Sequence, residues 1–272
     1  MSQRKIQQLT LQIHRGQLHR SAQVDDATAP FESVVSEGFD RSLLATLEQL
    51  RAEHGTSEPP FPKFPGAGSD GCSDGGCGKC AVLVNGVAQL SCQTTLQSIL
   101  GKANKKTAAL APLSKFPTAT GLVVERQKQR DAGATVATSA AALSSCIECG
   151  ICFEVCPNTG SDRSFVGPLR LVVAAGSFDD QESARRLSLG EQGVVGCHGA
   201  KNCTAYCPQG IDLASEIRDL NGKVRRQLWR SLFRSSSDYA SSSAEPSQAA
   251  PQERADEASP ADGGVVDSSK DD

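Results

Sequence analysis

The chain has 272 residues, a formal net charge of −3 and a sequence pI near 5.9, and only 4% of its residues are aromatic. A mildly acidic chain with few aromatic side chains lacks the basic surface and the stacking groups of a nucleic-acid-binding protein, so that class is excluded. The longest apolar run, at residues 169–176, is far shorter than the roughly 20 residues of a transmembrane helix, so we expect no membrane-spanning segment.

The 11 cysteines are far more than a cytosolic chain of this length needs for packing. The N-terminal stretch MSQRKIQQLTLQIHRG has no apolar segment of a secretory signal, so we expect a reducing compartment in which disulfides are rare. An odd number of cysteines also argues against a closed disulfide framework. The cysteines therefore indicate metal or redox chemistry.

The first predicted elements are a strand and a helix. The stretch IQQLTLQIH, residues 6–14, alternates leucine or isoleucine with polar neighbours, which predicts a strand. Four leucines recur at helical spacing between Asp40 and Gly55, which predicts a helix with Asp40 as its N-cap and Gly55 as its C-terminal stop.

A loop rich in Pro and Gly follows this helix, and Asn85-Gly86 then predicts the two-residue turn of a hairpin spanning residues 81–92. A further short strand is expected at residues 122–125. Together these elements predict a small sheet with one helix laid across it, in a first domain over residues 1–128.

After a polar, Ala-rich connector the strand signals fade, and the remaining cysteine runs are separated by segments that predict short helices. We expect a second, helical domain over residues 129–234. Residues 235–272 are rich in Ser, Ala, Pro and acidic side chains with almost nothing to bury, so this tail is predicted to be disordered.

The first domain contains four cysteines with the spacing C-x4-C-x2-C, then x11 and a fourth cysteine: Cys72, Cys77, Cys80 and Cys92. The first three match the plant-type [2Fe-2S] run, in which thiolates converge on two irons from one tight loop. The Asn85-Gly86 hairpin would return Cys92 to that loop. Three glycines allow the backbone to wrap closely and to aim N–H groups at sulfur: Gly75, Gly76 and Gly78. A structural zinc site with four thiolates is the alternative.

A second run reproduces the C-x2-C-x2-C-x3-C-P pattern of bacterial two-cluster ferredoxins, in which the fourth cysteine serves the other cluster. A third run lies at residues 196–208. The same rule predicts a [4Fe-4S] cluster held by Cys146, Cys149, Cys152 and Cys207. It leaves the other cluster with Cys156, Cys197 and Cys203.

Ala200 occupies the middle ligand position of the third run. Alanine cannot ligate iron, so only three thiolates remain, and they predict a [3Fe-4S] cluster. The alternative is a [4Fe-4S] cluster whose odd iron is ligated by water or by His198, since histidine is a ligand in Rieske centres. With a three-iron cluster, His198 is expected beside the cluster without ligating it.

The order of the three cysteine groups resembles the iron-sulfur subunit of succinate dehydrogenase and fumarate reductase. The resemblance covers residues 5–234, and all eleven cysteines take assigned places in it. Other segments similar to the family are Val84-Asn85-Gly86, Phe116-Pro117 and FVGP at residues 165–168.

The resemblance implies an α+β chain, with an N-terminal β-grasp [2Fe-2S] ferredoxin-like domain followed by an all-α two-cluster ferredoxin-like domain. It implies a subunit that relays electrons between an FAD-containing flavoprotein subunit active on succinate or fumarate and a membrane quinone, with no catalytic residue of its own. It also implies a membrane anchor subunit. A peripheral position on the cytoplasmic face of the inner membrane, or on the matrix face in mitochondria, is expected because the N-terminal stretch shows no secretory signal.

The chain departs from the family pattern at two places. The stretch CPNTGSDRSF, which begins at Cys156, lacks the tryptophan of many ubiquinone-using members, and its start is similar to members that use menaquinone through a haem-containing cytochrome b anchor. Pro157, Asn158 and His198 are accordingly expected beside the third cluster or on its quinone side. Ser73 stands where the family often has arginine, so the docking of the flavoprotein or the setting of the first cluster is expected to differ in detail.

Other interpretations stay open. The arginines and Trp229 within residues 216–234 either meet an anchor subunit or lipid headgroups, or belong to a solvated helix that packs on the domain. The alternative function is the iron-sulfur subunit of another flavoenzyme complex, of the thiol:fumarate or heterodisulfide reductase type. Such proteins carry further cysteine-rich segments, whereas no cysteine follows Cys207 here. A free ferredoxin and a zinc-binding protein are the remaining alternatives.

Overall fold

The computed structural model describes residues 8–14, 31–35, 37–54, 72–103, 106–126, 143–160, 162–176, 178–179, 182–190 and 192–241. Residues 1–227 form one unit by their contacts, and residues 228–272 form a second. The loop rich in Pro and Gly, the connector after the first predicted domain and most of the predicted tail lie outside the described residues.

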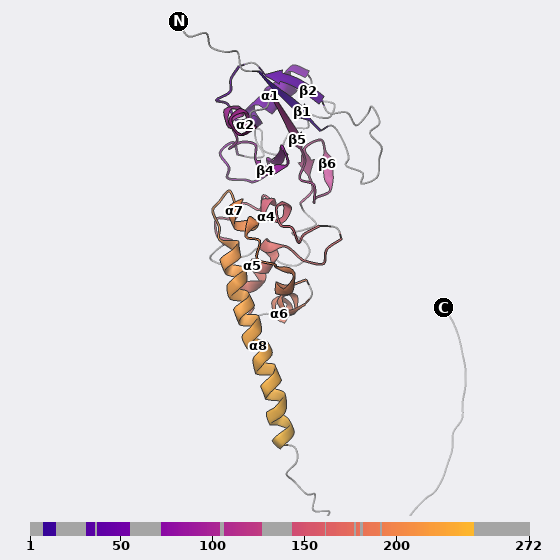
Figure 1. Ribbon diagram of the computed structural model, residues 1–272, viewed down its shortest axis with the longest axis vertical. Coiled ribbons are helices and arrows are strands. Elements are labelled where there is room, and N and C mark those ends of the chain that lie inside the picture. Colours follow the sequence, from indigo (N-terminus) through magenta and orange to yellow (C-terminus); the bar gives the residue numbers. More distant parts are fainter. Residues whose placement is uncertain are drawn as a thin grey trace, which may run out of the picture. The chain divides into compact units, whose positions relative to one another are not determined.

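Five strands form one sheet in the order β2-β1-β5-β3-β4 (Figure 1). They are β1 Leu9–Ile13, β2 Phe31–Val35, β3 Ala81–Val84, β4 Val87–Leu90 and β5 Thr107–Ala111. β1 and β5 are parallel, and the other neighbours are antiparallel. The predicted first strand is confirmed, because Leu9, Leu11 and Ile13 are fully buried in β1.

Two strands of this sheet are absent from the sequence-based prediction, for different reasons. β2 is an edge strand, and its Val34 is 60% exposed, so its apolar side chains do not mark one buried face. β5 has the sequence TAALA, and alanine has a low preference for strands. β5 is held by its pairing with β1 and β3, which are distant in the sequence.

Two helices contribute to the core of the sheet, where the sequence predicts one. α1 spans Leu43–His54 and α2 spans Leu96–Ala103. The predicted N-cap of α1 is wrong: Ser42, not Asp40, caps the helix, because Ser42 Oγ accepts a hydrogen bond from Ala45 N at 3.2 Å. α1 ends at His54, and Gly55 lies outside the described residues. α2 has only 8 residues, too few for a helical apolar period to stand out in the sequence.

The predicted hairpin between β3 and β4 is confirmed. Asn85 and Gly86 have φ angles of 51° and 79°, the left-handed pair that a two-residue type I′ turn requires. The strand expected at residues 122–125 is shorter than predicted. It is β7, Val123–Val124, which pairs with β6, Thr118–Thr120, in a separate two-stranded sheet.

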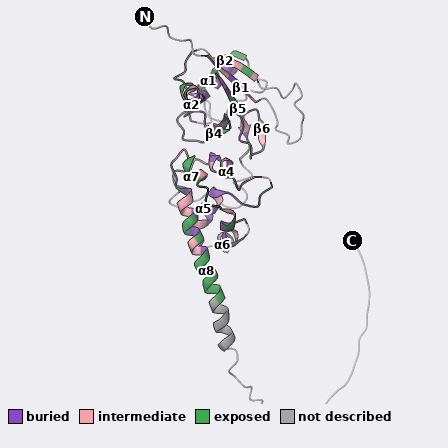
Figure 2. Ribbon diagram, viewed as in Figure 1, coloured by how far each residue is buried: buried purple, intermediate pink, exposed green. Residues whose placement is uncertain are grey.

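From residue 143 onward the described elements are helices. They are α4 Ile151–Glu154, α5 Pro168–Gly176, α6 Glu182–Leu189, a 3-10 helix Val194–Gly196, α7 Asn202–Ala205 and α8 Leu213–Ser241. Their apolar side chains form a second core, in which Leu171, Val172 and Leu220 are almost wholly buried. Figure 2 shows the buried positions on α5 and on the first part of α8.

α8 extends beyond the predicted end of the helical domain. The helix continues through residues 235–241, the first part of the tail that the composition predicts to be disordered. A helix that already exists extends readily, because each added residue gains a backbone hydrogen bond without a new nucleation step. Residues 242–272 lie outside the described residues. None of the described helices is long and apolar enough to cross a membrane.

Glu154 joins the helical part of the chain to the sheet part. It is only 8% exposed, and its Oε1 accepts hydrogen bonds from Ser114 N at 3.0 Å and Ser114 Oγ at 2.6 Å. Its Oε2 accepts a hydrogen bond from Lys115 N at 3.0 Å. Cys149 and Ile151 belong to the core of the sheet as well. The segment around α4 is therefore fixed to the loop that follows β5.

We expect Glu154→Ala to lower the free energy of unfolding of the cluster-loaded protein by about 3 kcal/mol, because three donors lose their acceptor in a poorly hydrated place. Glu182→Ala is the matched control: the Glu182 side chain is 62% exposed and pairs with Arg185 and Arg186 at the surface. Its loss should have an effect of about 0.5 kcal/mol or less. Thermal unfolding midpoints of the two variants measure the difference, and equal shifts would contradict the role given to Glu154.

Candidate iron-sulfur centres

The loop from residue 72 to residue 80 wraps backbone N–H groups around its first cysteine. Cys72 Sγ accepts hydrogen bonds from Gly76 N and Cys77 N, each at 3.0 Å. Gly75 has a φ of +90°, and a Cβ at this position would collide with the side-chain amide of Gln93. Donors aimed at a sulfur atom stabilise its thiolate, which is the state that ligates iron.

Cys80 and Cys92 complete the first group. The hairpin returns Cys92 to the loop, its Sγ lies 3.3 Å from Cys80 Sγ, and both residues are buried. The pKa of the Cys92 thiol is raised to about 12, chiefly by burial and to a smaller extent by the neighbouring Cys80 and Cys72. Such a thiol stays protonated at neutral pH unless a cation compensates the thiolate charge. This set of donors therefore fits a positively charged metal centre.

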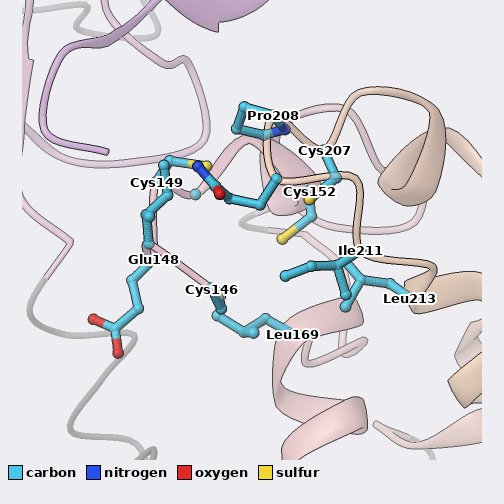
Figure 3. A pocket seen from close by; sticks show the side chains of 12 residues that line it. Cys146, Glu148, Cys149, Cys152, Leu169, Cys207, Pro208, Ile211 and Leu213 are labelled. Carbon is cyan, nitrogen blue, oxygen red and sulfur yellow. The ribbon is translucent and has the colours of Figure 1, made fainter. Parts of the chain in front are cut away.

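A pocket gathers the four cysteines of the second predicted group. It is lined by Cys146, Cys149, Cys152 and Cys207, with apolar side chains that include Ile147, Leu169, Ile211 and Leu213. Figure 3 shows Cys149, Cys152 and Cys207 directed toward one space and the Glu148 carboxylate directed away from it. Burial raises the pKa of Cys149 to about 11. Burial also raises the pKa of Cys152, and the charges of Cys149 and Cys146 raise it further.

The third predicted group also comes together. Cys156 and Cys203 are buried, and Cys197 is half-buried. Burial raises the pKa of Cys203, and the charges of Cys156 and Cys197 act in the same direction. Cys156 and Cys197 therefore lie close enough to Cys203 for their charges to act on its thiol. Ala200 is exposed, as is His198.

The second and third runs follow the same backbone course, with left-handed residues at equivalent positions. Glu148 and Gly199 have φ angles of 51° and 73°, and two residues later Gly150 and Lys201 have φ angles of 81° and 61°. Gly150 and Lys201 are the N-caps of the short helices α4 and α7. Ala200 therefore stands where Cys149 stands in the other run, on a loop that has kept the shape of a ligand loop.

Of the residues expected beside the third cluster, Asn158 has a clear structural role. It is 8% exposed, and its Nδ2 donates a hydrogen bond to Gly196 O at 2.9 Å. This contact fixes the residue directly before Cys197. Pro157 and His198 are exposed.

The first and second cysteine loops lie directly against each other at Gly78. This residue has a φ of +67°, and a Cβ on it would lie 2.6 Å from Ile147 O and 2.9 Å from Cys149 Cα. Gln209 Nε2 donates a hydrogen bond to Gly75 O at 3.2 Å across the same junction. The first two candidate sites are therefore neighbours, with no room for a side chain between Gly78 and Cys149.

Sequence reasoning missed two cations at these sites. Lys115 Nζ donates hydrogen bonds to Thr159 Oγ1 at 3.1 Å, to Phe153 O at 3.5 Å and to Cys156 O. Arg126 donates to the carbonyls of Gly78 and Lys79. No sequence signal marks either residue, because almost all their acceptors are backbone carbonyls about forty to fifty positions away.

Two family models match the chain in the order that the cysteine spacing predicts. One, a 2Fe-2S iron-sulfur cluster binding domain, matches residues 10–131, and the other, a 4Fe-4S dicluster domain, matches residues 142–211. The succinate dehydrogenase iron-sulfur subunit of Bacillus subtilis is 28% identical over 191 residues, which covers 60% of this chain and 73% of that relative. The fumarate reductase iron-sulfur subunit of Escherichia coli O6:H1 is 30% identical over 175 residues, covering 54% of this chain and 69% of that relative.

The chain belongs to the family of succinate dehydrogenase and fumarate reductase iron-sulfur subunits. This confirms the predicted iron-sulfur cofactors and the predicted role as an electron-transfer subunit of an oxidoreductase. Among the described residues, no three Cys, His, Asp or Glu side chains converge as a single metal ion would need.

The fold is also similar to that of a solved family structure. A chain of the Mycobacterium smegmatis Sdh1 complex in the apo form matches with a TM-score of 0.63 and 18% sequence identity, covering 82% of this chain and 97% of that chain. The part of the chain that holds the sheet matches the 2Fe-2S domain, and the helical part that follows matches the 4Fe-4S domain.

Gly78→Ala is expected to lower the amount of iron and acid-labile sulfide retained per chain, and to destabilise the protein by about 2–3 kcal/mol through left-handed strain and overpacking. Gly86→Ala is its matched control, since Gly86 has a φ of +79° but nothing within 4 Å of an added Cβ. That variant meets only the backbone strain, about 1 kcal/mol. Iron and sulfide assays with thermal midpoints compare the two. Equal losses would mean that the contact with Cys149 is unimportant.

Proposed function

We propose that this subunit passes electrons singly between an FAD-containing flavoprotein subunit, active on succinate or fumarate, and a membrane quinone. A flavin exchanges two electrons with a dicarboxylate as a unit, so one-electron centres are needed to deliver them one at a time. The observation that carries the proposal is the succession of three cysteine groups in one chain, with the first two loops in direct contact at Gly78.

The proposed ligands are the cysteines of these three groups. The [2Fe-2S] cluster is assigned to Cys72, Cys77, Cys80 and Cys92, the [4Fe-4S] cluster to Cys146, Cys149, Cys152 and Cys207, and the [3Fe-4S] cluster to Cys156, Cys197 and Cys203. When bound, each cluster supplies a centre that gains and loses one electron. The chain itself holds the sulfur atoms in place, donates backbone N–H groups to Cys72 Sγ and surrounds the second group with apolar side chains.

The backbone repeat favours three irons at the third site over a histidine-ligated fourth iron. Ala200 occupies the position equivalent to Cys149, so the ligand position itself holds a methyl group. His198 occupies the position equivalent to Ile147, which is not a ligand position in the second run. Losing one iron changes the charge of a cluster and hence its reduction potential.

The proposed division of the chain is a β-grasp domain up to residue 128 and an all-α two-cluster domain from residue 129. The parallel pairing of β1 and β5 at the centre of the sheet, with α1 in the same core, supports the first assignment. The family models, which match residues 10–131 and 142–211, support a division between them.

The proposed partners are the flavoprotein subunit and a membrane anchor of the cytochrome b type, with menaquinone as the quinone. The chain would lie peripherally on the cytoplasmic face of the inner membrane, or on the matrix face in mitochondria. The CPN sequence at residues 156–158 supports this choice of quinone, and the exposed Pro157 and His198 are accessible to a partner beside the third site.

Low-temperature EPR of the intact complex tests the three-iron assignment. The oxidised complex should show a [3Fe-4S] signal that disappears on mild reduction. Ala200→Cys should replace it with a reducible [4Fe-4S] signal, because a fourth thiolate completes the ligand set. Ala200→Val is the control, since valine adds bulk without a ligand and should keep the three-iron signal. A wild-type complex with two reducible [4Fe-4S] signals and no three-iron signal would contradict the assignment.

A further inference from the structure

A cationic side chain binds the backbone of the ligand loop of the first site. Arg126 follows β7, and its two terminal nitrogens donate hydrogen bonds to Gly78 O and Lys79 O, each at 2.7 Å. Gly78 and Lys79 are the two residues between Cys77 and Cys80. A planar guanidinium that binds two successive carbonyls fixes both their direction and the position of its own charge.

The same guanidinium acts on the second site. Gly78, whose carbonyl it binds, is packed against Ile147 O and Cys149 Cα, so the loop that Arg126 holds is the loop that touches the second group. A positive charge is therefore held at the junction of the two sites.

The other charges near these loops are less well placed for this role. The charge of Lys79 also acts on Cys77 of the first site. Both Lys79 and Asp74 are exposed, so water screens their charges. Glu148 is directed away from the pocket of the second site (Figure 3). Arg126 is half-buried and is held by two hydrogen bonds to the ligand loop.

We propose that Arg126 is the positioning residue shared by the first two clusters, and that its fixed charge raises the reduction potential of both. Adding one electron to either centre adds one negative charge, with no bond formed or broken, and a nearby cation favours that state. A unit charge about 10 Å from a centre, in a medium of effective dielectric constant about 20, changes a one-electron equilibrium roughly tenfold. The inference rests on the ligands proposed above for the two sites.

Redox titrations of the intact complex, followed by EPR, test the inference with two variants. Arg126→Gln keeps a hydrogen-bond donor but removes the charge. At a fixed potential it should lower the ratio of reduced to oxidised cluster about tenfold for both the [2Fe-2S] and the [4Fe-4S] signals, a shift of about 60 mV for one electron. Arg126→Lys keeps the charge but loses the paired hydrogen bonds to Gly78 O and Lys79 O. It should leave both potentials close to those of the wild type while its thermal midpoint falls. The third cluster is the internal control, and its potential should not change.

Unchanged potentials in R126Q, or equal shifts in R126Q and R126K, would overturn the electrostatic role of Arg126. If R126Q loses its clusters during purification, R126K decides the question: wild-type potentials support the inference, and shifted potentials overturn it. Failure of the ligand assignment would be recognised separately, because the wild-type complex itself would then lack one of the three EPR signals.

Discussion

The buried carboxylate of Glu154 is the interaction that fixes the second cysteine run to the sheet part of the chain. A carboxylate out of water is costly unless donors surround it, and here Ser114 and the backbone of Lys115 supply three hydrogen bonds. The ammonium group of Lys115 extends the link, because it donates to Cys156 O just beyond the C-terminal end of α4. α4 carries Cys152, and Cys156 follows it, so a single short helix fixes one proposed ligand of each of two clusters. Any movement of α4 would disturb both sites at once.

Crowded thiols explain why this fold and its clusters depend on each other. Burial raises the pKa values of Cys92, Cys149 and Cys152, so the metal-free protein would keep protons where iron needs thiolates. Binding iron then releases those protons and replaces mutual repulsion of sulfur charges by attraction to a cation. The protein itself compensates a small part of the thiolate charge, through the N–H groups that donate to Cys72 Sγ and through the charge of Arg126. The iron compensates the remaining thiolate charge, and this allows several cysteines to lie close together in each site.

The sequence predicted those parts of the structure that depend on residues close together along the chain. The cysteine spacing indicated all three groups, and Asn85-Gly86 fixed the hairpin that returns Cys92, because a two-residue turn needs both residues left-handed. The parts that it missed depend on distant partners. β5 is a strand because β1 and β3 flank it, and Arg126 bonds a carbonyl 48 residues earlier. The cap of α1 was misplaced because several residues near a helix end satisfy the same local preferences.

The loop at Ala200 shows that a ligand position can lose its sulfur while the loop keeps its shape. Lys201 holds a left-handed φ of 61°, which is unfavourable for a residue with a Cβ, so other contacts must maintain it. Asn202 Nδ2 donates to Val155 O at 3.1 Å, and this bond ties α7 to the end of α4. α7 carries Cys203 and leads to Cys207, which lines the pocket of the second group. The loop therefore helps to place proposed ligands of two sites, while the side chain of Ala200 is exposed. On the proposed ligand assignment, a side chain at residue 200 sets the number of irons at the third site, while the backbone of the loop serves the second.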